Sequence, residues 1–288
     1  MANIEIQNLQ KYYGKNLVLD IPSINFQSGN SIGVFGANGS GKSTFIKCLT
    51  GLVPFNGKIT IDNKDISKEP SIMTNVGLLI EEPALYKDLT GRKNIEYFCK
   101  DTSKLTEYAK ILDVSDILDR KVRSYSLGMC QKIAILLACI KGKNLILLDE
   151  PFNCLDIISV EKVIDLMNLC KKNGSTIIFT SHQLEISQKA LDIYYLLKNN
   201  QIYDCTAPHI VGGKKFIIEF FNKKSAYLAY TLLKENNYEC VLDDFYIKIL
   251  NNTNIQKIVN ILDELDIKKI EDISYSIKES YLEMENIK

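Results

Sequence analysis

The stretch "GANGSGKST", Gly36 to Thr44, decides the fold because it fits the phosphate-loop pattern G-x-x-x-x-G-K-[ST] without a mismatch. It follows an apolar strand, "SIGVF", and it opens a helix, "STFIKCLTGL", which is the context that the pattern requires. Glycines let consecutive backbone N–H groups point inward at phosphate oxygens, and the start of the helix adds its positive end. The sequence therefore predicts an α/β fold with a nucleotide phosphate site at this turn.

The side chains of this phosphate loop divide the work of binding. Lys42 is expected to bring a positive charge to the β- and γ-phosphates, and Ser43 to offer a hydroxyl to Mg²⁺. The other predicted nucleotide-binding positions of the loop are Gly36, Asn38, Gly39, Ser40, Gly41 and Thr44.

A second motif, "LILLDE", indicates what happens to the phosphate. Its apolar residues predict a short strand that is buried on both faces of a parallel sheet. Asp149 ends this strand, where ligand sites of parallel sheets lie, and we expect it to hold Mg²⁺. Glu150 follows directly and is placed to polarise an attacking water. The two carboxylates predict hydrolysis rather than binding alone.

Composition limits the remaining possibilities. The chain has 288 residues, which suggests two domains, and equal numbers of basic and acidic residues, 35 of each, which disfavours direct nucleic-acid binding. Its 8 cysteines form no C-x-x-C pair, as expected for small buried side chains in a reducing cytosol. The apolar runs are far shorter than the ~20 residues of a membrane helix. Any membrane role must therefore depend on a partner.

The order of predicted elements gives a large first domain. Short strands are expected within residues 3–61, with Asn56-Gly57 as a hairpin turn before "KITI". A polar helical region follows at about 85–125, and then an apolar helix over 129–141. A helix at about 158–172, the buried strand "STIIFTS" and a hairpin in "DIYYLLKNNQIYD" continue the α/β pattern.

The composition changes at "TAPHIVGGKK", residues 206–215, whose proline and glycines suggest a linker. Beyond it the predicted order is strand 215–221, helix 223–235, strands 238–242 and 245–249, helix 253–264, strand 267–275 and a short helix. This βαββαβ order is the ferredoxin-like arrangement. We therefore expect a small C-terminal α/β domain over 208–288.

Four motifs in this order, "GANGSGKST", "YSLGMCQK", "LILLDEPFNCLD" and "FTSH", resemble the ATP-binding subunits of ABC transporters. The resemblance covers residues 1 to about 207. It implies a P-loop NTPase fold of the ABC type with a helical subdomain, and ATP and Mg²⁺ as its ligands.

The resemblance also implies roles for residues outside the phosphate loop. In "KYYG", Tyr13 matches the position that stacks on adenine, with Tyr12 as the alternative. Glu81 stands where the family has a glutamine that touches Mg²⁺ and the transporter. His182 matches the histidine that contacts the γ-phosphate, and "NCLD", 153–156, matches a loop that runs between two subunits.

The segment "YSLGM", Tyr125–Met129, matches the family's signature motif. In the family, this segment of one chain meets the nucleotide held by another, so the resemblance implies a homodimer around two ATP molecules. Ser126 and Gly128 keep the positions of the phosphate contacts, and Ser126 also suits a helix N-cap. This chain departs from the commonest family residues at Leu127, Met129, Lys132, Phe152 and Cys154.

The finer resemblance is to exporters of peptide antibiotics of the bacitracin and lantibiotic self-protection type. It implies a transmembrane permease as partner and a place on the cytoplasmic face of the membrane. The C-terminal domain is open to regulatory, dimer-stabilising, permease-contacting or purely packing roles. Two other functions stay open at this point: a soluble ABC-type ATPase coupled to a protein or nucleic-acid machine, and a nucleotide sensor that does not hydrolyse ATP.

Overall fold

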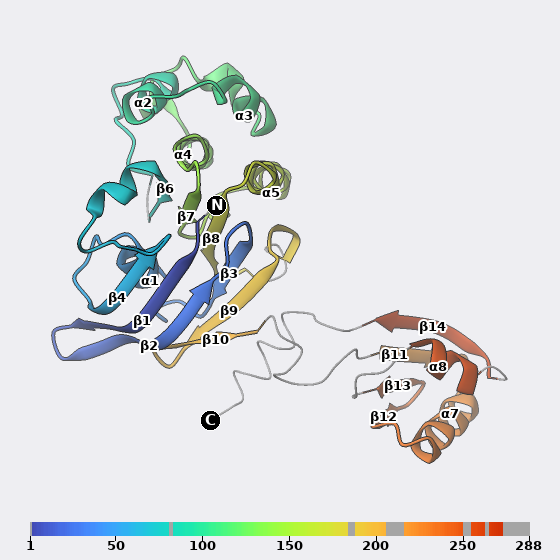
Figure 1. Ribbon diagram of the computed structural model, residues 1–288. Helices are drawn as coiled ribbons and strands as arrows, with labels where there is room; N and C mark the ends of the chain where they lie inside the picture. The colour runs from blue at the N-terminus through green and yellow to red at the C-terminus, as the bar shows by residue number, and fades with distance from the viewer. Residues whose placement is uncertain are drawn as a thin grey trace. The chain divides into compact units, whose positions relative to one another are not determined.

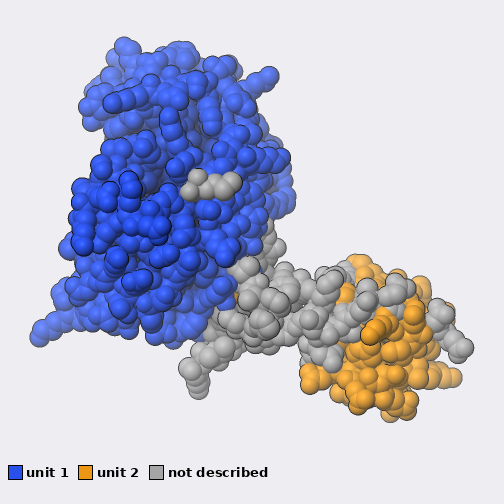
Figure 2. Space-filling view, in the orientation of Figure 1, with its two compact units in different colours: residues 1–204 blue, residues 205–288 orange. Residues whose placement is uncertain are grey.

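The computed structural model describes residues 2–80, 83–183, 188–205, 216–249, 255–262 and 265–272. The chain divides into two units, residues 1–204 and residues 205–288 (Figure 2). The predicted linker, 206–215, and the short helix expected after the last strand lie outside the described residues.

A six-stranded sheet carries the first unit, in the order β10-β9-β3-β8-β7-β6 (Figure 1). Neighbouring strands are parallel except for the β9–β10 pair, which forms the predicted hairpin. Every residue of β3, β7 and β8 is buried, as their continuous apolar runs predict. The strands are β3 (Ser31–Phe35), β6 (Val76–Leu79), β7 (Leu145–Leu148), β8 (Thr176–Ser181), β9 (Ile193–Lys198) and β10 (Gln201–Asp204).

A second, antiparallel sheet has the order β2-β1-β4-β5 and shares a core with the first. Its strands are β1 (Ile4–Tyr13), β2 (Asn16–Phe26), β4 (Asn56–Ile61) and β5 (Lys64–Asp65). Helix α1 (Lys42–Leu49) contributes Phe45 and Ile46 to this core, next to side chains from both sheets. The start of α1 is thereby fixed against the strand that precedes the phosphate loop.

The predicted hairpin turn at Asn56-Gly57 is wrong. Both residues lie inside β4, which pairs with β1 through a register shift between Gln7 and Gln10. Gly57 has φ of 104°, and a Cβ there would lie 2.2 Å from the carbonyl oxygen of Asn8. The glycine is therefore needed at a bulge where two strands approach closely, and not in a turn.

Helices cover the other face of the six-stranded sheet. Helix α4 (Leu127–Lys141) packs on β6 and β7, and α5 (Ile157–Lys172) packs on β8. The predicted helical region contains α2 (Gly91–Phe98) and α3 (Leu105–Ile111), which contact α4 (Figure 1). Single 3₁₀ segments occupy Pro70–Asn75, Ser115–Ile117, Val122–Ser124 and Gln188–Ala190.

The second unit is an antiparallel sheet with the strand order β12-β13-β11-β14 and a core of its own. In chain order its elements are β11 (Phe216–Phe220), α7 (Lys223–Glu235), β12 (Cys240–Asp243), β13 (Tyr246–Ile249), α8 (Ile255–Ile261) and β14 (Ile267–Asp272). A βαββαβ chain with β13 inserted between β12 and β11 is the ferredoxin-like topology that the sequence predicts. Among the described residues, no helix combines the length and the apolar character that crossing a membrane requires.

Candidate nucleotide-binding site

The phosphate loop connects the end of β3 to the start of α1. Gly39 and Gly41 have φ of 82° and 105°, a left-handed backbone that side chains disfavour. A Cβ at Gly36 would lie 2.5 Å from Ser40 Oγ, so this position also needs glycine. Ser40 Oγ is buried and has no hydrogen-bond partner among the described residues. A buried hydroxyl without a partner in a glycine-rich cradle fits an anion with several acceptor oxygens.

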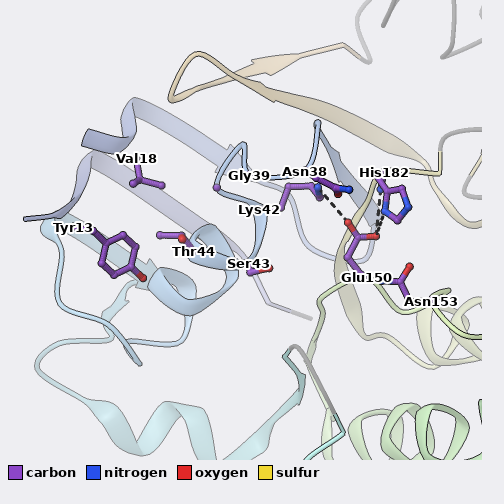
Figure 3. A pocket seen from close by; sticks show the side chains of 11 residues that line it. Tyr13, Val18, Asn38, Gly39, Lys42, Ser43, Thr44, Glu150, Asn153 and His182 are labelled. Carbon is purple, nitrogen blue, oxygen red and sulfur yellow. Dashed lines mark hydrogen bonds and ion pairs between the residues drawn. The ribbon is translucent and has the colours of Figure 1, made fainter. Parts of the chain in front are cut away.

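An open pocket of about 500 Å³ lies in front of this loop (Figure 3). Six of its lining residues belong to the loop and to the start of α1: Asn38, Gly39, Gly41, Lys42, Ser43 and Thr44. Tyr13 and Val18 line one end of the pocket, and Glu150, Asn153 and His182 line the other (Figure 3). Predicted residues of four separate motifs, "KYYG", the phosphate loop, "LILLDE" and "FTSH", thus meet at one place.

Three charged or titratable side chains converge in the pocket. Lys42 Nζ donates to the carbonyl oxygens of Gly36 and Ala37, at 2.9 Å and 3.2 Å, and lies 3.2 Å from Glu150 Oε1. The other oxygen of the same carboxylate, Oε2, lies 2.9 Å from His182 Nδ1. Glu150 therefore lies between a lysine that is 6% exposed and a histidine at the mouth of the site (Figure 3).

The backbone of Glu150 has an unusual conformation. Its φ is 47°, and a left-handed backbone at a residue other than glycine costs on the order of 1–3 kcal/mol. The Glu150 N–H donates to Thr180 Oγ1 at 3.0 Å, and the Thr180 hydroxyl donates to Asp149 Oδ1 at 2.6 Å. One buried threonine therefore fixes both carboxylate residues that the sequence predicts to act.

Asp149 is 2% exposed and does not line the pocket. It directly follows β7 and precedes Glu150, and its backbone N–H donates to Leu79 O at 2.8 Å. Ser43 lines the pocket from the first turn of α1. A carboxylate and a hydroxyl are oxygen ligands of the kind that Mg²⁺ prefers, so the residues present fit this ion.

Two further predictions concern the tyrosine that stacks on adenine and the third Mg²⁺ ligand. Tyr13 lines the pocket with Lys11 Nζ 4.5 Å above its ring centroid, whereas the alternative, Tyr12, does not line it. Glu81, the predicted third Mg²⁺ ligand, lies outside the described residues.

The signature segment lies apart from this pocket, and neither Ser126 nor Gly128 lines it. Ser126 caps α4 by accepting a hydrogen bond from the Met129 N–H at 3.2 Å. A Cβ at Gly128 would lie 2.8 Å from the carbonyl oxygen of Cys154, so the start of α4 contacts the loop that follows Glu150. Leu127 between them is 74% exposed.

Two groups near the signature segment have shifted pKa values. Burial raises the pKa of the Cys130 thiol, which keeps it protonated and poorly reactive. The Ser159 N–H donates to Asp156 at the start of α5 and lowers the pKa of that carboxyl. These shifts fit structural roles for both side chains.

Comparison with known proteins decides the family. A family model described as "ABC transporter" matches residues 19–153. The chain is 38% identical over 192 residues to the ABC transporter ATP-binding protein YybJ of Bacillus subtilis (strain 168). The matched region covers 63% of this chain and 86% of YybJ. It is 32% identical over 204 residues to the lantibiotic transport ATP-binding protein SrtF of Streptococcus pyogenes, covering 69% of this chain and 88% of SrtF. The chain belongs to the ABC transporter ATP-binding proteins.

A solved structure of an ATP-binding cassette is similar in fold to the first unit. The ADP conformation of MJ1267, an ATP-binding cassette of an ABC transporter, superposes with a TM-score of 0.60 at 26% identity, covering 70% of this chain and 90% of that one. The protein is accordingly an ABC-type ATPase with ATP as its substrate and Mg²⁺ as its cofactor. Members of this family work with a membrane permease and with a second ATPase subunit.

The sequence did not single out every residue that shapes the site. Val18 and Asn153 line the pocket, and Thr180 and Gln131 hold the backbone of Glu150. Thr180 lies two residues before His182 in a quoted motif, but no sequence pattern states that its hydroxyl bridges two neighbouring carboxylate residues. Gln131 is separated from Glu150 by 19 residues, so its contact depends on how α4 packs.

Proposed function

We propose that this ATPase drives the export of an antimicrobial peptide or a similar compound, by pairing with a second copy around ATP and acting on a separate permease. The observation that carries the catalytic part is the Glu150 carboxylate, placed between Lys42 and His182 in a phosphate-binding pocket. A nucleotide-binding module that only senses ATP would not require this base next to the phosphate loop.

Glu150 is the general base in this proposal. A water attacks the γ-phosphorus and gives its proton to the carboxylate, while the bond between the γ-phosphorus and the bridging oxygen of ADP breaks. Lys42 stabilises negative charge on the β- and γ-phosphates, and His182 donates a hydrogen bond to the γ-phosphate. The products are ADP and inorganic phosphate.

Ser43 and Asp149 would hold Mg²⁺, which neutralises phosphate charge when it is bound. Ser43 supplies a hydroxyl from the first turn of α1, and Asp149 a carboxylate already fixed by Thr180. The glycines and Ser40 of the phosphate loop surround the phosphate oxygens, and Tyr13 offers its ring to the adenine.

A second copy of the chain would complete the site. Ser126 and Gly128 carry the phosphate contacts of the signature segment, yet neither lines the pocket of its own chain. Leu127 lies between them and is 74% exposed, and Ile157 and Ile158 at the start of α5 are 77% and 68% exposed. Pairing of two chains through this face would remove that apolar surface from water and bring each signature segment to the other chain's nucleotide.

An apolar groove offers a contact for the permease. It has a volume of about 340 Å³, and its lining includes Leu52, Ile80, Leu85, Phe98 and Leu137. Tyr86 and Tyr97, which are 50% and 67% exposed, pack edge to face beside Phe98. An amphipathic helix from a permease loop fits such a groove. This contact would hold the ATPase at the cytoplasmic face of the membrane.

The peptide substrate is supported by the relative SrtF, whose name assigns it to lantibiotic transport. Co-purification with a membrane protein encoded beside this gene tests the transport role. Leu85→Glu should then reduce co-purification, because it puts a charge into the groove, while ATP binding is retained. Undiminished co-purification of Leu85→Glu would exclude the groove as the contact.

Glu150→Gln tests the catalytic proposal. Removal of a general base typically lowers the rate by about 10²- to 10⁴-fold, so we expect hydrolysis to fall by at least about a hundredfold. ATP affinity, measured by calorimetry, should be retained because Lys42 and the phosphate loop are intact. Glu161→Gln, the same change at an exposed position of α5, is the matched control. Wild-type hydrolysis by Glu150→Gln would remove Glu150 from the reaction.

A further inference from the structure

Gln131 is a buried polar residue one turn into α4, and the proposed function above does not use it. It is 5% exposed. Its amide Nε2 donates to the carbonyl oxygen of Pro151 at 3.1 Å and to that of Glu150 at 3.3 Å. A buried amide directed at the backbone of the general base requires an explanation beyond helix packing.

The backbone that Gln131 contacts is held from several directions. Thr180 in β8 accepts from the Glu150 N–H at 3.0 Å, and the Asn153 N–H donates to the Glu150 carbonyl at 3.2 Å. Gln131 is the contact from the helical side. With φ of 47° at Glu150, this turn is strained, so it keeps its shape only while such contacts oppose relaxation.

The same helix begins at the signature segment. Gly128 lies three residues before Gln131, on the same side of α4, and packs against the backbone of Cys154. Ser126 caps this helix. One rigid element therefore connects the segment expected to meet the partner chain's nucleotide with the residue that hydrolyses the chain's own nucleotide.

We propose that Gln131 is a positioning residue: it sets the direction of the Glu150 carboxylate and couples it to the position of the signature segment. This inference rests on the proposed role of Glu150 as general base. When the signature segment binds the nucleotide of the other chain, a movement of α4 would shift Gln131. Through its hydrogen bonds, Gln131 would then displace the carbonyl groups of Glu150 and Pro151. Nucleotide binding at one ATP site of a pair would thereby affect the position of the catalytic carboxylate at the other site.

The first experiment replaces Gln131 by methionine, which has a similar length and no donor. The account predicts that kcat falls about tenfold to a hundredfold, since small misplacements of a reacting group cost on that order. The Kd for ATP should stay within about twofold of wild type because the phosphate loop is unchanged, and the ATP dependence of the rate should become less cooperative. Gln131→Asn, whose amide is too short to reach, should behave alike and serves if the methionine variant does not fold.

Ile135→Val, a fully buried position one turn after Gln131 in the same helix, controls for a general loss of packing in α4. It should leave kcat and cooperativity unchanged. Gln131→Met with a kcat within twofold of wild type would overturn the inference, as would an equal loss in Ile135→Val at matched stability.

The second experiment combines Gln131→Met with Glu150→Gln. If Gln131 acts through Glu150, Gln131→Met should not lower the small residual hydrolysis of Glu150→Gln any further. A further loss by the factor seen in the wild-type background would contradict the inference. The two failures are distinguishable: an active Glu150→Gln protein removes the proposed base, whereas an inactive Glu150→Gln beside a fully active Gln131→Met overturns the positioning role alone.

Discussion

At the scale of single residues, the site depends on the position of the Lys42 side chain. Its Nζ donates to two carbonyl oxygens of the phosphate loop and pairs with Glu150. These contacts direct its charge to the pocket in which we propose that the phosphates bind.

Lys42→Ala should raise the Kd for ATP at least about tenfold, because a hydrogen bond to a charged group contributes about 1.5–3 kcal/mol. Calorimetry on the purified variant measures this directly. Lys58→Ala, at an exposed position of β4, is the control and should bind ATP normally. An unchanged Kd for Lys42→Ala would place the nucleotide elsewhere.

The residues of the phosphate loop and of "LILLDE" could be predicted because each motif fixes its own local geometry. In the structure, Lys42, Glu150 and His182 line the same pocket, and their predicted roles in binding and hydrolysis stay predictions. The contact between Gln131 and Glu150 could not be predicted, because it depends on how α4 packs against the turn at Glu150, whose backbone is left-handed. The spacing of the two residues in the sequence does not indicate this packing.

At the scale of elements, the close packing of α4 on β6 fixes the distance between the signature helix and the sheet. A Cβ at Gly77 in β6 would lie 1.9 Å from the carbonyl oxygen of Ala138 in α4. No side chain fits between the two backbones, so α4 lies directly on the strand. The positions of Gln131 and the signature segment follow from this contact.

Gly77→Ala should therefore lower the free energy of unfolding by about 3 kcal/mol or more, the upper end of the usual cost of overpacking, because the added Cβ would meet backbone atoms. Gly51→Ala is the comparison, because φ of 69° strains it while a Cβ there meets nothing within 4 Å. It should lose only about 1–2 kcal/mol. Urea unfolding of both variants decides the matter. Equal free energies of unfolding for the two variants would show that α4 can shift away from β6 at little cost and does not fix the site.

Elements were predictable where one pattern persisted along the chain, as in the continuous apolar runs of β7 and β8 and in α7 of the second unit. The prediction was wrong at Asn56-Gly57, where a pair of turn-forming residues lies inside β4. The reason is a contact between residues far apart in the sequence, because Gly57 makes room for the backbone of Asn8 in β1, 49 positions earlier. A local sequence pattern does not indicate such a contact.

At the scale of the whole molecule, the chain has two units with separate cores. Chain order alone predicted the ferredoxin-like topology of the second unit, because a split βαβ arrangement leaves few alternative strand orders. The first unit contains the whole phosphate pocket, while Ser126 and Gly128 lie outside it. In the function proposed above, a second chain supplies these two residues, and the number of chains cannot be predicted from the geometry of one chain.

Pairing driven by nucleotide is the central claim, and sedimentation of Glu150→Gln tests it most directly. With hydrolysis blocked, ATP should hold two chains together, so the protein should sediment as a dimer with ATP and Mg²⁺ and as a monomer without them or with ADP. Ser126→Arg, which puts bulk and charge into the signature segment, should bind ATP and stay monomeric in the same background. A Glu150→Gln protein that is saturated with ATP and still sediments as a monomer would contradict the account.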